Sequence, residues 1–159
     1  MTDSKRQLAA DMDTIMSEHR ILGAILLRHQ EALVGFEFSA ALGELEDFSR
    51  RLRRHQRVEE DFLMPAYCRL KELPRNGQPE TIIEEHKSIQ EKVDGLLTTA
   101  RGLSAESSSR RAVVLLIERV AHLKVLLERH VRREESTVLP LLRAVVGDGA
   151  TNHNHIHKD

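Results

Sequence analysis

Two segments of the chain carry the same arrangement of histidine and glutamate. Residues 55–65, HQRVEEDFLMP, and residues 130–140, HVRREESTVLP, share the pattern H-x-x-x-E-E followed by a proline. A Glu-His pair precedes each segment, Glu18-His19 in the first half and Glu85-His86 in the second. Imidazole nitrogens and carboxylate oxygens are ligands for transition metals. The two-fold recurrence therefore predicts a site for two metal ions.

Helical geometry explains why this spacing suits metal binding. Side chains at positions i and i+4 of a helix lie on the same face, so His55 with Glu59, and His130 with Glu134, can each reach one point. One such pair alone is typical of a helix surface, and a single inward histidine is typical of a hydrogen-bonded core residue. Six inward histidines and glutamates, spread over four helices, are not typical of either a helix surface or an ordinary core. Buried glutamates are costly unless they are paired, and two cations remove that cost.

The simplest assembly uses both glutamates as bridges. Glu59 and Glu134 would each contact both ions, with His19 and His55 on one ion and His86 and His130 on the other. An oxo or hydroxo bridge would complete the pair and leave one open coordination position on each metal.

Long helices must hold these residues. Apolar residues recur at the 3/4 spacing of amphipathic helices in four stretches, at about 11–35, 38–72, 80–100 and 110–146. Turn signals separate them, the strongest being Leu73 to Pro79, and Gly147 ends the last. We expect an all-α fold, an up-down-up-down antiparallel four-helix bundle. The expected organisation is an N-terminal extension (1–10), the bundle (11–146) and a disordered tail (147–159).

Two local expectations follow. With a reversal near Gly35, His19 and His55 are at the same height in the bundle. Pro65 and Pro140 each lack a backbone donor and should kink or open the helix just beyond the site.

Composition limits the classes of function. The chain has 159 residues, a net charge of -1, 3% aromatic residues and no tryptophan, which argues against a nucleic-acid partner. The single cysteine, Cys68, excludes a disulfide within the chain and is expected to be incidental. Neither a secretion signal nor an apolar stretch long enough to cross a membrane is recognisable. We therefore expect a cytoplasmic protein with no membrane partner.

Other polar residues receive secondary roles. His29 and His122 are interpreted as structural. Glu18, Glu60, Glu85 and Glu135 lie off the apolar stripes and are either solvated or support the ligands. The basic run from Arg50 to Arg54 is interpreted as a solvated face. The tail histidines His153, His155 and His157 either bind a metal weakly or are a cloning remnant.

As a set, these motifs resemble the hemerythrin-like, HHE cation-binding family over about residues 10–146. The resemblance implies a four-helix bundle with a non-haem di-iron centre. It also implies the ligand set His19, His55, Glu59, His86, His130 and Glu134.

The chain departs from the oxygen-carrying members of that family. They have H-x-x-x-H on the third helix, where this chain has Gln90 four residues after His86, and they end in H-x-x-x-x-D, where this chain has Glu134 four residues after His130. Four histidines and two glutamates are more similar to the di-iron domain of bacterial proteins that repair iron centres, which carry an additional N-terminal cysteine-bearing domain.

Three classes of function remain. The first is a di-iron protein that binds or senses O2, NO or peroxide at an open metal position. The second is an enzyme that reduces NO or peroxide, or donates iron for repair. The third is a bundle whose metal is structural, or an interaction module that responds to iron. A path from solvent to the metal would favour the first two classes.

Overall fold

The computed structural model describes residues 3–104 and 109–147, and all regular structure in these ranges is helical. Four long helices form the body of the molecule: α1 (Asp3–Val34), α2 (Phe38–Val58), α4 (Pro79–Arg101) and α5 (Arg110–Arg133). Shorter elements extend them: the π-helices η1 (Glu59–Leu63) and η3 (Glu134–Val138), the 3-10 turn η2 (Arg75–Gly77), and the helices α3 (Met64–Tyr67) and α6 (Leu139–Gly147).

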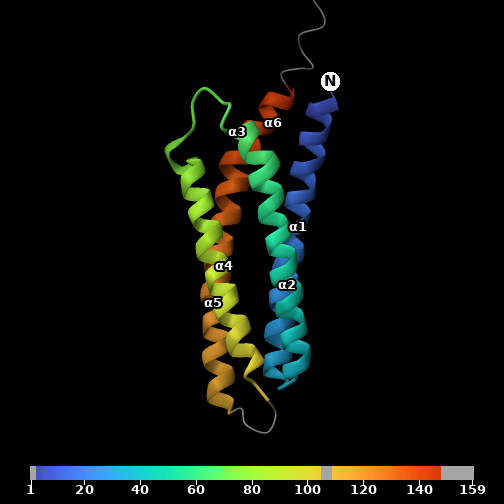
Figure 1. The fold of residues 1–159 in the computed structure, drawn as a ribbon, viewed down its shortest axis with the longest axis vertical. Coiled ribbons are helices and arrows are strands. Elements are labelled where there is room, and N and C mark those ends of the chain that lie inside the picture. The colour runs from blue at the N-terminus through green and yellow to red at the C-terminus, as the bar shows by residue number, and fades with distance from the viewer. Residues whose placement is uncertain (1–2, 105–108, 148–159) are drawn as a thin grey trace, which may run out of the picture.

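The long helices pack as a four-membered bundle. α1 contacts α2 and α5, and α4 contacts the same two helices. The start of α1, α3 and α6 lie at one end of the bundle, and the α1–α2 connection lies at the other (Figure 1). Among the described residues, no helix is both long and apolar enough to cross a membrane.

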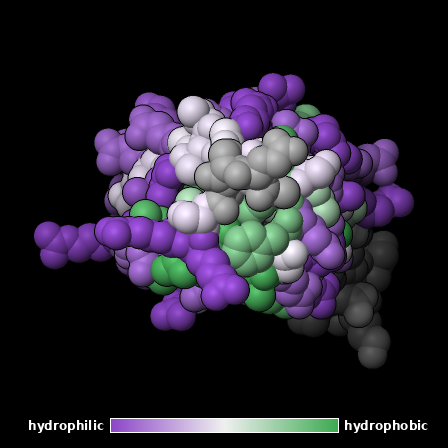
Figure 2. Space-filling view, turned by 90° about the horizontal axis from the view of Figure 1, so that it is seen from below, coloured by the Kyte–Doolittle hydropathy of each residue, from purple (hydrophilic) through white to green (hydrophobic). Residues whose placement is uncertain are grey.

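The α1–α2 reversal lies where the sequence predicts it. The N–H of Glu37 donates to the carbonyl of Ala32, and the N–H of Phe36 donates to that of Leu33. Phe36 has a φ of 57°, the left-handed conformation typical of a residue just past a helix end. Seen from this end, hydrophilic residues surround a smaller hydrophobic area (Figure 2).

Both proline positions follow a widened turn, which confirms the expected local opening. The N–H of Met64 donates to the carbonyl of Glu59, five residues back, and η3 ends in the same way with Leu139 and Glu134. Such π-helical turns occur frequently at functional sites. Each one begins at a glutamate of the predicted site.

Two apolar clusters fill the bundle, and the histidines lie between them. In α1, Ile15 belongs to the cluster at the α3/α6 end and Leu22 to the cluster on the other side, with His19 between them. In α4, Ile82 and Ile89 flank His86 in the same way. The predicted site is therefore a polar layer with an apolar cluster on each side of it along the bundle axis.

Two helix ends differ from expectation. α1 begins at Asp3 and includes most of the expected extension, because Leu8 packs against the apolar cluster and the Lys5 amine donates to the carbonyl of Val145. The helical segment after η1 ends at Tyr67 rather than near residue 72. The N–H of Leu70 donates to the carbonyl of Tyr67, three residues back, which is a tighter turn than that of an α-helix. The tail beyond Gly147, with its three histidines, lies outside the described residues.

Candidate metal centre

The structure brings all six predicted side chains together inside the bundle. They come from α1 (His19), α2 (His55), η1 (Glu59), α4 (His86), α5 (His130) and η3 (Glu134). All six are buried, and Glu59 has no exposed surface. The rings of His19 and His55 lie 4.9 Å apart, and those of His86 and His130 lie 4.8 Å apart, so each pair is at one height.

Each carboxylate spans the two histidine pairs. Oε1 of Glu59 lies 2.9 Å from Nε2 of His55, and its Oε2 lies 3.1 Å from Nε2 of His86. Glu134 does the same from the other side. Its Oε2 lies 3.2 Å from Nε2 of His19, and its Oε1 lies 3.4 Å from Nε2 of His130. Each carboxylate therefore contacts one histidine of each pair.

Two groups of four donor atoms result. One comprises His19, His55, Glu59 and Glu134, and the other comprises Glu59, His86, His130 and Glu134; within each group the atoms lie within 4.8 Å of one another. Both oxygens of Glu59 and Nε2 of His19, His86 and His130 are buried and lack a hydrogen-bond partner among the described residues. Buried polar atoms are rarely left unsatisfied. The cluster therefore fits a bound metal cation in each group.

The second ring nitrogens show how the imidazoles are held. The Nδ1–H of His19 donates to Glu135 over 2.9 Å, that of His86 to Glu60 over 2.7 Å, and that of His130 to Glu85 over 3.2 Å. A carboxylate only accepts, so each of these contacts places a proton on Nδ1, and when the ring is neutral Nε2 carries the free lone pair. In their neutral form the three rings would therefore present Nε2 to a metal.

The sequence left open whether the glutamates next to the ligands are solvated or support them, and these hydrogen bonds answer that question. Glu60, Glu85 and Glu135 support ligand residues and are not merely solvated. Each is directly adjacent in the chain to a predicted ligand, which is the signal that could have found them. The role of Arg133 was not predicted. It donates through Nε and Nη2 to both oxygens of the buried Glu85.

His55 is the exception among the four imidazoles. Its Nδ1 is buried without a hydrogen-bond partner among the described residues. Glu18, which corresponds to Glu85 in the other half, lies 3.6 Å from Arg51 instead. Glu18, Arg51 and His55 border a small cavity of about 40 Å³. The two halves therefore differ at this ligand.

Burial and neighbouring charges shift the pKa values of the clustered residues. Burial lowers the pKa of His19, but Glu134 and Glu59 outweigh it and raise the pKa to about 10. Burial also lowers the pKa of His86, but Glu59 outweighs it and raises the pKa to about 9. Burial and the neighbouring charge of Glu59 raise the pKa of Glu134. In the metal-free protein, protons on the imidazoles therefore take the place of cations.

A supporting carboxylate behaves differently. Burial raises the pKa of Glu85, but His130 and Arg133 outweigh it and bring the pKa down to about 2. Glu85 is therefore charged at neutral pH and is a strong acceptor for His130.

The remaining candidates lie outside the cluster. His29 is fully buried and its Nδ1–H donates to the carbonyl of Ala41 over 2.7 Å, which is a structural role. His122 and Cys68 are exposed. The amide of Gln90 donates to Asp94 over 3.1 Å, while its carbonyl oxygen is buried without a partner in the described structure. Gln90 therefore has its amide nitrogen paired and its carbonyl oxygen unpaired among the described residues.

Comparison with known proteins agrees with the geometry. The family model for the hemerythrin HHE cation binding domain matches residues 10–142. Neither a curated protein nor a solved structure matches the chain. The match covers most of the sequence and contains all six clustered residues. The chain belongs to the hemerythrin HHE cation-binding family.

Proposed function

We propose that this chain is a non-haem di-iron protein that binds or senses O2, NO or peroxide in the cytoplasm. Its ligands are His19, His55, Glu59, His86, His130 and Glu134, on an up-down-up-down bundle. The two carboxylates, with an oxo or hydroxo group, would bridge the two irons. Helical bundles with inward histidines and glutamates are a common scaffold for di-iron sites. When bound, the iron pair supplies redox chemistry and a position for a small exogenous ligand.

The observation that carries the proposal is a cavity beside His19. It has a volume of about 140 Å³ and lies between α1 and α5, bordered by His19, Gly23, Leu26, Leu127 and Val131, with Lys124 and Glu128 at its polar side. Gly23 and Glu128 are exposed, so the cavity opens to solvent. Its apolar lining suits a small, uncharged molecule. This access favours ligand binding over a sealed structural metal.

The corresponding region of the other half contains larger polar side chains. Gly23 lies four residues after His19, and Gln90 lies four residues after His86. Val131 follows His130, and the buried Gln56 follows His55, its amide donating to the carbonyl of His86 over 3.3 Å. A Cβ built at Gly23 would meet nothing within 4 Å, so that position is open. We infer that small ligands reach the centre from the His19 side.

Anaerobic reconstitution with ferrous iron tests the proposal. Metal analysis should give two irons per chain, and optical and electron paramagnetic spectra should change on adding O2, NO or peroxide. One tightly bound iron, or none, would refute the two-iron centre. Spectra unaffected by all three molecules would favour a structural metal. Continuous consumption of NO or peroxide with an added reductant would instead identify an enzyme.

A further inference from the structure

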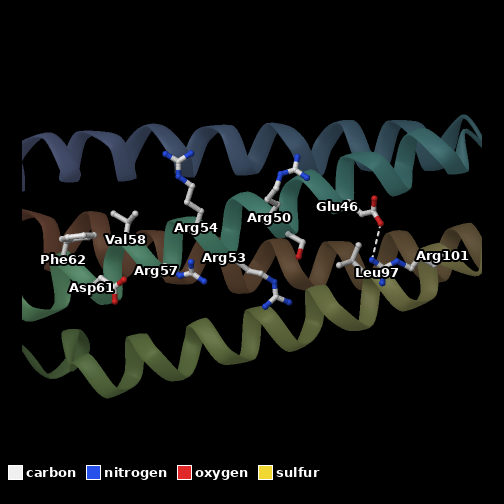
Figure 3. A pocket seen from close by; sticks show the side chains of 11 residues that line it. Glu46, Arg50, Arg53, Arg54, Arg57, Val58, Asp61, Phe62, Leu97 and Arg101 are labelled. Carbon is white, nitrogen blue, oxygen red and sulfur yellow. Dashed lines mark hydrogen bonds and ion pairs between the residues drawn. The ribbon is translucent and has the colours of Figure 1, made fainter.

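A second cavity lies outside the cluster of six metal-site residues. It is a groove of about 620 Å³ along α2 and α4 (Figure 3). Five arginines border it, Arg50, Arg53, Arg54, Arg57 and Arg101, against two acids, Glu46 and Asp61. The chain as a whole has a net charge of -1. Positive charge is therefore concentrated at this groove.

The arginines repel one another along α2. Arg50, Arg53, Arg54 and Arg57 are three or four residues apart, the spacing at which like charges on a helix destabilise it. A helix C-terminus would favour basic residues, but here the backbone continues from α2 into η1, whose amides occupy the α2 carbonyls. An anionic ligand in the groove would reduce this repulsion.

Neighbouring acids neutralise the cluster only in part. Arg50 pairs with Asp47 over 2.5 Å, Arg53 with Asp94 over 2.7 Å, and Arg101 with Glu46 over 3.3 Å. Arg57 has no ion pair or hydrogen bond to another described residue. In Figure 3 the side chains of Arg53 and Arg57 lie on the side of α2 that faces α4, whereas Arg54 extends on the α1 side. The planar guanidinium group binds phosphate oxygens in a bidentate manner.

The end of the groove near η1 has a different character. Asp61 supplies a carboxylate that can accept hydrogen bonds from hydroxyl groups, and it forms no ion pair with another described residue. Beside it, Phe62 is 58% exposed and Val58 is partly buried. An exposed phenylalanine ring offers a face on which a flat ring can stack. Cationic, carboxylate and aromatic groups therefore follow one another along the helix.

We propose that this groove binds a nucleoside phosphate. Its phosphates contact Arg53 and Arg57, its ribose hydroxyls contact Asp61, and its base stacks on Phe62. Arg53 and Phe62 both border the groove and are nine residues apart, about 13 Å along the helix axis. The volume lies within the range of about 300–1,000 Å³ typical of small-molecule sites. The Arg101–Glu46 ion pair joins the two helices towards the other end, which favours a small ligand over a long polymer (Figure 3).

Calorimetric titration of the full-length, metal-loaded protein tests the proposal with ADP, pyrophosphate and adenosine. The wild type should bind ADP and pyrophosphate, and adenosine much more weakly. The double variant Arg53→Gln/Arg57→Gln should weaken both phosphates by roughly tenfold or more. Phe62→Ala should weaken ADP but not pyrophosphate.

A matched control separates the groove from general charge effects and from phosphate binding at the metal. Arg110→Gln/Arg111→Gln removes the same charge at the start of α5, outside the groove, and should bind ADP like the wild type. Iron content, measured in each variant, should not change. Absence of ADP binding at millimolar concentration, or equal losses in both double variants, would overturn the proposal. So would binding of RNA or an acidic peptide without binding of ADP.

Discussion

Nδ1 of His86 lies 2.7 Å from Oε1 of Glu60, and the two residues come from opposite halves of the chain. The same relationship recurs in reverse, since His19 of the first half contacts Glu135 of the second over 2.9 Å. Each half therefore orients an imidazole of the other. Outer partners of this kind fix the ring and raise its basicity as a ligand.

Removal of these partners should weaken metal binding without removing a ligand. We expect Glu60→Ala and Glu135→Ala each to lower metal affinity about 10- to 100-fold, the usual effect of losing such a partner. Glu84→Ala, at an exposed position on α4 beside Glu85, is the control and should leave affinity unchanged. Competition with a chromophoric chelator measures all three. Equal affinities would show that the Nδ1 contacts do not support metal binding.

Removal of a bridging carboxylate should have the largest effect on metal content. Glu59→Ala or Glu134→Ala removes a group that faces both histidine pairs, so both ions should be lost together. His29→Ala should retain two irons per chain but lose about 2 kcal/mol of stability, because a buried ring and its bond to Ala41 disappear. Metal analysis and urea unfolding separate the two effects. A one-iron Glu59→Ala protein would contradict the bridging arrangement.

Metal removal should lower the melting temperature, and increasingly so as pH rises. The pKa values of His19 and His86, about 10 and about 9, lie above the ordinary 6.5. Their protonation therefore stabilises the metal-free fold fully below pH 6.5, and this contribution is lost as pH rises through 9 to 10. Metal requires neutral imidazoles, so the loaded protein lacks this dependence. Thermal melts of both forms across this range test the prediction; parallel curves would contradict it.

The cavity beside His19 should control how fast small ligands arrive. Gly23→Leu fills open space and should slow NO association by about tenfold, equivalent to about 1.4 kcal/mol on the entry barrier. Gly43→Leu is a matched control, because it also replaces an exposed helical glycine with open space around it but lies in α2 away from the cavity. Stopped-flow mixing with NO measures both. Equal rates would place the entry path elsewhere.

Substitutions of Gln90 should change how the centre reacts with O2. An amide is a poorer iron ligand than imidazole, and Gln90 is one turn after His86. We expect Gln90→His to slow the oxidation of the ferrous protein in air, while the wild type oxidises quickly and binds NO or azide. The alternative is that the unpartnered carbonyl oxygen of Gln90 accepts a hydrogen bond from water at the metal. In that case Gln90→Ala should alter ligand spectra without changing iron content.

The grouping of the six site residues follows directly from helical spacing, which is why the sequence could predict it. The i,i+4 relation of His55 and Glu59 holds in any α-helix, and the short turn at Gly35 places His19 beside them. Contacts between helices could not be predicted in this way. Glu18 and Glu85 occupy equivalent positions in the sequence, yet one lies near Arg51 and the other is held by Arg133. Such outcomes depend on the side chains that neighbouring helices present.

The arginines of α2 show the same limit. Their spacing indicates a solvated face, and their side chains are largely exposed. Only the packing of α4 against α2 reveals that they border a groove. The start of α1 at Asp3 also depends on distant residues, since Val145 and the apolar cluster around Leu8 hold its first turns.

The open position at Gly23 has a consequence for how such a molecule can diversify. In a dimer of two identical helical hairpins, every substitution would appear twice, and an entrance on one side would require the same entrance on the other. Joining the hairpins in one chain removes that constraint. Gly23 can differ from Gln90, and Val131 from Gln56. The histidines and glutamates of the site nevertheless remain the same in the two halves. Covalent fusion thus allows the surroundings of the two halves of the site to differ while its histidines and glutamates stay paired.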